Sequence, residues 1–127
     1  MEKTKAGLLL EQLQIVAQEK AQIDLIGTWF QGSQTYLDAL AEEIVEVKTE
    51  LQLGRQCYLE DELADLLWNI VCLIEHLELE EKVDQKQVFQ RAVKKYTERV
   101  TARLPHETWD DVKVRQKLDL EKEFSKQ

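Results

Sequence analysis

Residues 42–65 read EEIVEVKTELQLGRQCYLEDELAD, and they contain two short acidic motifs. The first motif begins at Glu42 and contributes Glu43 and Glu46, and the second contributes Glu62 and Asp65. Fifteen residues separate Glu46 from Glu62, and both motifs lie in sequence rich in helix-forming residues. Because residues three apart share one face of a helix, each motif presents two carboxylates on one side of its helix.

Antiparallel packing of these two helices would bring the four carboxylates together. Converging carboxylates repel one another, and partial burial raises the cost of their charged forms. A divalent cation removes that cost, and a ligand set made only of oxygen atoms favours Mg²⁺, with Mn²⁺ as a substitute. The sequence therefore predicts a metal site at Glu43, Glu46, Glu62 and Asp65.

Other interpretations of these acids are less favoured. Carboxylates on helices are usually solvated, and that explanation suits any single pair in a chain with 33% charged residues. Glu62 and Asp65, however, interrupt a helix that is otherwise almost entirely apolar, where carboxylates need a partner. A bridged iron centre needs Glu-x-x-His pairs, and His76 and His106 complete none. Zinc is also disfavoured, because no His or Cys lies at a useful spacing.

The composition indicates an all-α protein with a single domain. The chain has 127 residues, 43% of them apolar, but only one proline and four glycines, which leaves little room for the turns of a β-rich fold. We expect one domain over 1–127, with a core at about 4–104 and a tail at 105–127. The net charge of −8 argues against a nucleic-acid polymer as partner.

The cysteines and the apolar runs indicate a cytoplasmic protein. Cys57 and Cys72 form neither a metal motif nor a disulfide framework, so we expect two reduced thiols. The apolar run at 8–10 is too short for a signal peptide. We expect no membrane partner, because no run approaches the length of a membrane span.

Apolar spacing and breaker residues predict four main helices that pack as a four-helix-bundle-like fold. We expect them at 4–26, from a Ser33 cap to Gly54, at 58–79, and from an Asp84 cap to about 103, with Pro105 as a breaker and a tail that is helical from Asp110.

The third of these helices is apolar almost all round from Leu63 to Leu77. In so small a chain this pattern predicts an interface between subunits, and we expect a homodimer or homotetramer. One stripe of the helix is different and carries the second acidic motif: Tyr58, Glu62, Asp65, Asn69, Cys72 and His76.

The chain resembles the MazG-like nucleotide pyrophosphohydrolases of the all-α NTP pyrophosphatase superfamily. That family's signature is Glu-Glu-x-x-Glu, a spacer and Glu-x-x-Asp, which corresponds here to Glu42, Glu43, Glu46, Glu62 and Asp65. The flanking sequence extends the resemblance to about residues 25–115, through Trp29, Gln34-Thr35, Leu37, Lys95-Tyr96, Arg99, Pro105-His106, Trp109, Val112 and Lys113. Val93 departs from the family's pattern, which often has an asparagine at this position. The departure affects one expected contact with the substrate and leaves the metal site unaffected.

The resemblance implies a Mg²⁺-dependent hydrolase that acts in nucleotide-pool house-cleaning. It implies that a (d)NTP and water give a (d)NMP and pyrophosphate, with four acids as both catalytic and metal-binding residues: Glu43, Glu46, Glu62 and Asp65. Mg²⁺ suits this chemistry, because it can bridge phosphate oxygens and neutralise developing charge. One of the signature carboxylates or Glu42 is the candidate general base.

Four further residues are candidates for substrate binding: Trp29, Asn69, Lys95 and Arg99. Trp29 would stack on the base, or it belongs to the core. Asn69 faces the same way as Asp65 and would contact the substrate, or it pairs with a buried polar group. Lys95 and Arg99 would hold the triphosphate, or they belong to a solvated helix face.

His76 is expected to be a structural histidine rather than a catalyst. Two alternative functions stay open at this point. The enzyme could act on another phosphorylated substrate, or the chain could be a non-catalytic helical interaction module, although its four intact signature acids argue against the latter.

Overall fold

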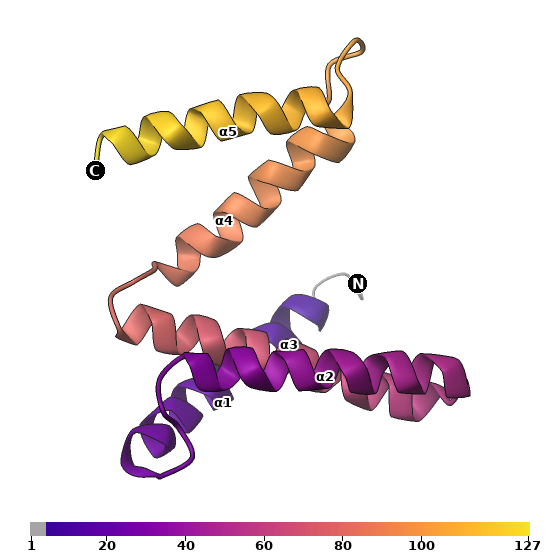
Figure 1. Ribbon diagram of the computed structural model, residues 1–127, viewed down its shortest axis with the longest axis vertical. Coiled ribbons are helices and arrows are strands. Elements are labelled where there is room, and N and C mark those ends of the chain that lie inside the picture. Colours follow the sequence, from indigo (N-terminus) through magenta and orange to yellow (C-terminus); the bar gives the residue numbers. More distant parts are fainter. Residues whose placement is uncertain (1–4) are drawn as a thin grey trace. The chain divides into compact units, whose positions relative to one another are not determined.

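The computed structural model describes residues 5–127, which form helices and no strands (Figure 1). The all-α fold is confirmed. The elements are α1 (Lys5–Ile26), α2 (Gln34–Leu53), α3 (Gln56–Leu79), α4 (Gln85–Tyr96), the π-helical turn η2 (Thr97–Thr101) and α5 (Trp109–Ser125). The start of the first helix and of the core, predicted at residue 4, lies outside the described residues.

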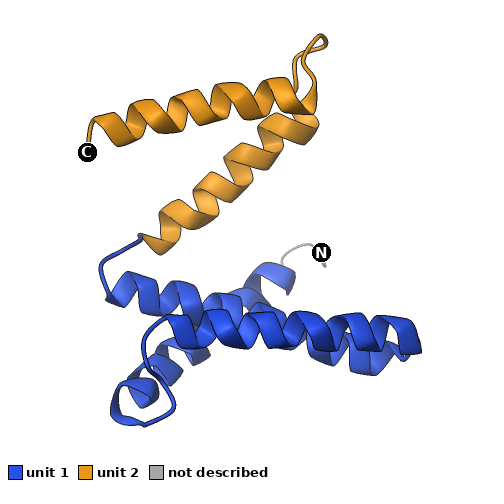
Figure 2. Cartoon of the chain, in the orientation of Figure 1, with its two compact units in different colours: residues 1–83 blue, residues 84–127 orange. Residues whose placement is uncertain are grey.

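The chain divides into two compact units, residues 1–83 and residues 84–127 (Figure 2). The first unit holds α1, α2 and α3, and the second holds α4, η2 and α5. The single domain expected over 1–127 stays a prediction.

A tight turn joins α2 to α3, and the two helices run antiparallel in the first unit (Figure 1). Gly54 has a φ of +70°, a conformation that glycine adopts without a Cβ clash, and its N–H donates to the carbonyl of Glu50 at 3.0 Å. Arg55 then pairs with the buried carboxylate of Glu50. The turn therefore reverses the chain within two residues and sets the two acidic motifs opposite each other.

The polar stripe of α3 packs inside the first unit, together with only part of the apolar surface of this helix. Asn69 and His76 on that stripe are buried. Leu63, Leu67 and Ile70 are instead 48%, 47% and 43% exposed. The core around which the helices pack is small and consists of Ala17, Tyr36, Val71 and Cys72, with Leu10, Leu13, Phe30, Trp68 and Leu73 packed against it.

The second unit begins at the predicted cap, where the Asp84 carboxylate accepts a hydrogen bond from the Lys86 amide at 3.0 Å. The regular helix α4 ends earlier than the predicted residue 103, because the chain continues as the π-helical turn η2. Hydrogen bonds in a π-helix span five residues instead of four. The tail is helical, as expected, and Thr108 with Asp111 forms a capping box at the start of α5.

Over residues 5–127, none of the helices combines the length and the apolar character that a membrane span requires. Cys57 is exposed and Cys72 is buried, and both are free thiols.

Candidate active site

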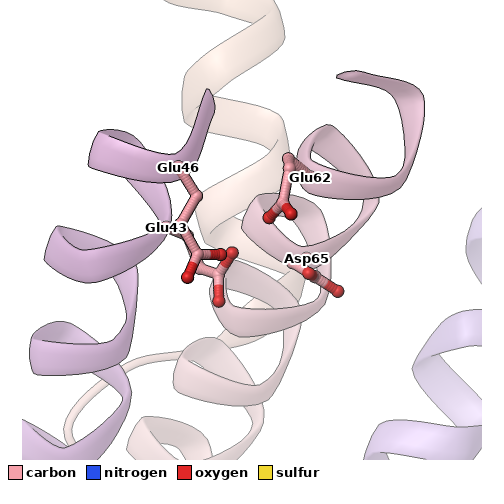
Figure 3. Close-up of side chains that lie close together, drawn as sticks. All are labelled: Glu43, Glu46, Glu62 and Asp65. Carbon is pink, nitrogen blue, oxygen red and sulfur yellow. The ribbon is translucent and has the colours of Figure 1, made fainter. Parts of the chain in front are cut away.

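The four acids predicted as metal ligands lie together between α2 and α3 (Figure 3). Glu43, Glu46, Glu62 and Asp65 each offer a carboxylate oxygen, and these four atoms lie within 4.8 Å of one another. Glu46 is exposed and the other three are half-buried. Glu42 is exposed on α2, next to this cluster in sequence. The spacing of the motifs and the turn between the helices together produce this convergence.

Two oxygen atoms of the cluster need a partner. Glu43 Oε2 and Glu62 Oε2 are buried, and among the described residues neither has a hydrogen-bond donor. Leaving such an oxygen atom unmatched is unfavourable, because it has lost its hydration without gaining a partner. A hard divalent cation satisfies carboxylate oxygens directly, so these residues fit a site for a divalent metal.

The acids of the cluster also oppose one another's ionisation. Glu46, with which a protonated Glu62 shares a hydrogen bond, raises the pKa of Glu62 to about 7, and burial and Glu43 add to this effect. Burial raises the pKa of Glu43, and the closeness of Glu46 raises it further. Both pKa values are raised in part because like charges are held close together, and a bound cation would relieve this repulsion.

A cavity of about 610 Å³ opens beside the acids. Glu43 and Asp65 lie in its lining, together with Trp29, Trp68 and Asn69. The volume falls within the range of small-molecule sites. The structure thus brings Trp29 and Asn69, both expected to contact substrate, to the same cavity as two of the acids. Their role there stays a prediction.

Asn69 and Trp29 differ in how tightly their surroundings hold them. Asn69 is 7% exposed, and its Nδ2 donates to the main-chain carbonyl of Asp65 at 2.9 Å. Trp29 is 53% exposed in the segment between α1 and α2. Buried pairing and access to the cavity therefore coexist at Asn69, whereas Trp29 offers a broad aromatic surface.

A buried polar network, which the sequence did not indicate, forms another part of the cavity lining. Asp24 accepts a hydrogen bond from Tyr36 Oη at 2.5 Å, pairs with His76 Nε2 at 2.8 Å and forms an ion pair with Lys20. Burial opposes the ionisation of Asp24, but its bonds to Lys20, Tyr36 and His76 outweigh burial and lower its pKa. His76 also stacks on Phe30 with ring centroids 4.0 Å apart, so its contacts are structural, as expected.

A signal for this network exists in the first helix. Ala17, Ala21 and Asp24 share one face of α1, and all three are buried. Small residues on one face allow a neighbouring helix to approach closely, and an acid on such a face needs a partner. The larger apolar residues Leu8 and Leu9 of the same helix are instead 54% and 63% exposed.

The two predicted phosphate contacts lie in the second unit. Lys95 and Arg99 line a cavity of about 620 Å³ there, together with Lys113. Arg99 is 9% exposed, its Nε donates to Gln116 Oε1 at 2.8 Å, and its guanidinium lies over the ring of Trp109. These contacts make Arg99 part of the packing of this unit, and phosphate binding by Lys95 and Arg99 stays a prediction.

The fold and the cluster define an all-α protein with a carboxylate site suited to a divalent metal. The family model of the MazG nucleotide pyrophosphohydrolase domain matches residues 31–104, which is more than half of the chain, and the chain therefore belongs to this family. The resemblance seen in the sequence is confirmed. The match includes both acidic motifs, whereas all of α1 and all of α5 lie outside it. No curated protein and no solved structure matched the chain.

Replacing Glu62 by Gln tests the repulsion within the cluster. The pKa of Glu62 is raised from an ordinary 4.5 to about 7, so the folded protein holds this proton more tightly than the unfolded chain does. Without metal, the contribution of Glu62 to stability therefore declines as pH rises from about 4.5 to about 7. In EDTA at pH 8, we expect Glu62→Gln to melt at a higher temperature than the unsubstituted protein in calorimetry, with little difference at pH 4.5.

The matched control is Glu60→Gln, which removes the same charge from an exposed position on α3 and should show no such pH-dependent gain. Added Mg²⁺ should raise the melting temperature of the unsubstituted protein more than that of Glu62→Gln. A metal-free Glu62→Gln protein that melts below the unsubstituted protein at pH 8 would contradict the repulsion.

Proposed function

We propose that the chain is a Mg²⁺-dependent nucleoside triphosphate pyrophosphohydrolase, with Mn²⁺ as a substitute metal. In this reaction a (d)NTP and water give a (d)NMP and pyrophosphate. One observation carries the proposal: four carboxylates converge, two of them with an unmatched buried oxygen, in a chain of a nucleotide pyrophosphohydrolase family.

The four clustered acids have a direct role in this proposal. Glu43, Glu46, Glu62 and Asp65 are the ligands that would hold Mg²⁺, which supplies positive charge to the phosphate oxygens and acidifies a bound water. A signature carboxylate or Glu42 accepts the proton of the attacking water. The water oxygen forms a bond to the α-phosphorus, the bond from this phosphorus to the oxygen that bridges the α- and β-phosphates breaks, and pyrophosphate leaves.

The remaining predicted residues contact the substrate in this proposal. Trp29 stacks on the base and Asn69 contacts the substrate, because both line the cavity that Glu43 and Asp65 also line. Lys95 and Arg99 supply positive charge to the outer phosphates, because the four carboxylates and the triphosphate together carry more negative charge than the metal cancels.

We place this activity in nucleotide-pool house-cleaning in the cytoplasm, where the two free thiols would stay reduced. A panel of canonical, deoxy and modified NTPs, assayed with Mg²⁺ by the release of pyrophosphate, measures the preference directly. House-cleaning requires a higher kcat/KM for an unwanted nucleotide than for the common ones, and equal values would reject it.

We further propose that the chain assembles as a homodimer or homotetramer. Leu63, Leu67 and Ile70 expose an apolar side of α3, and exposed apolar surfaces of this kind normally mark an interface. Sedimentation velocity at micromolar concentration should show a dimer or tetramer, and Leu67→Glu should shift it toward monomers. A well-folded, stable monomer of the unsubstituted chain would contradict the assembly.

Asp65→Asn should lower kcat by more than about a hundred-fold while the helical circular dichroism is retained, because it removes a proposed metal ligand that buries little apolar surface. Asp61→Asn is the matched control, since Asp61 is an exposed acid on the same helix and lies outside the cluster. Near-normal Mg²⁺-dependent turnover by Asp65→Asn would reject the metal assignment.

The position of bond cleavage follows from a reaction in ¹⁸O-labelled water. We expect the label in the nucleoside monophosphate, because water attacks the α-phosphorus. Release of orthophosphate together with a nucleoside diphosphate would reject a pyrophosphohydrolase and indicate a different phosphatase.

A further inference from the structure

The proposed reaction does not use the network around Asp24, although Asp24 and His76 in this network are buried polar residues of the first unit. The Asp24 side chain is only 2% exposed. Its partners come from all three helices of the unit: Lys20 from α1, Tyr36 from α2 and His76 from α3. Asp24 therefore fixes groups that are far apart in sequence.

Two partners of Asp24 are also the groups that contact Trp29. The Lys20 ammonium lies 4.5 Å from the centroid of the Trp29 ring. The ring of Tyr36 meets Trp29 nearly at a right angle, with centroids 5.2 Å apart and planes at 81°. Lys20 Nζ also donates to Tyr36 Oη at 3.2 Å, so Lys20, Tyr36 and Asp24 are mutually connected.

Trp29 needs such contacts to hold one orientation. It lies between α1 and α2 and is 53% exposed, so no tight packing fixes its indole ring. An aromatic ring that is already ordered binds a flat partner more tightly, because less conformational freedom is lost on binding. Lys20, Asp24, Trp29 and Tyr36 all line the cavity that Glu43 and Asp65 also line.

We propose that Asp24 is a positioning residue for recognition of the substrate's base: by fixing Lys20 and Tyr36, it holds Trp29 as an ordered wall of the cavity. This inference rests on the proposed function, since it takes the ligand of the cavity to be a nucleotide. Asp24 acts only through Lys20, Tyr36 and Trp29 and takes no part in the reaction at phosphorus.

The first test observes Trp29 directly and needs no activity. The full chain is labelled with 5-fluorotryptophan, and the ¹⁹F resonance of Trp29 is assigned through Trp29→Phe. In Asp24→Asn, we expect this resonance to move toward its position in the unfolded chain, while that of Trp109, in the second unit, stays in place. Glu19→Gln, which removes an exposed acid from the same helix, is the control and should leave both unchanged.

The second test separates positioning from a general loss of stability. In Asp24→Asn, the KM for an NTP should rise about five- to thirty-fold, the range that ordered stacking of one base supports, with kcat changed less than about two-fold. Inorganic tripolyphosphate has no base, so its inhibition constant should stay the same. An equal rise in KM and in this inhibition constant would overturn the proposal, as would an unchanged KM.

A second variant tests the positioning role of Asp24 if the first variant fails to fold. If Asp24→Asn does not fold, Tyr36→Phe replaces it, because it keeps the ring against Trp29 and removes only the hydroxyl bonded to Asp24 and Lys20. The same displacement of the Trp29 resonance is then expected.

The proposed function and the positioning role can fail separately. If the unsubstituted protein cleaves no NTP, the proposed function fails. An unchanged Trp29 resonance in a folded variant rejects the positioning role of Asp24.

Discussion

Repulsion between the clustered carboxylates of α2 and α3 is the interaction that the packing of the first unit has to overcome. Glu43, Glu46, Glu62 and Asp65 place four oxygen atoms within 4.8 Å of one another, and the pKa of Glu62 rises to about 7 in response. The turn at Gly54 and the packing of the two helices hold these groups together against that repulsion. Such stored repulsion is typical of a site that a divalent cation stabilises on binding.

The surroundings of the cluster divide recognition among different parts of the chain. The segment 31–104, which the family shares, contains all four acids. Asp24, Lys20 and Trp29 precede that segment and approach the same cavity from the side of α1. In our account, the shared segment therefore supplies the phosphate chemistry, whereas α1 and the residues after it shape the wall that meets the base.

Features of this structure that follow from local sequence patterns were easier to predict than features that depend on contacts between distant residues. The spacing of Glu43 with Glu46 and of Glu62 with Asp65 follows directly from helix geometry, and so does their convergence once a glycine turn joins the helices. Asp24 was missed because its burial depends on His76, fifty-two residues away, and no local pattern encodes that pairing. The π-helical turn at 97–101 was missed for a different reason, because apolar periodicity alone predicts a regular helix there.

The most direct measurement of the central claim is anomalous diffraction at the manganese edge from crystals grown with Mn²⁺. We predict a peak between α2 and α3, beside the carboxylates of Glu43, Glu46, Glu62 and Asp65. Crystals of Asp65→Asn grown in the same way should show a weaker peak or none. Manganese bound elsewhere on the chain, with no peak between these two helices, would contradict the account.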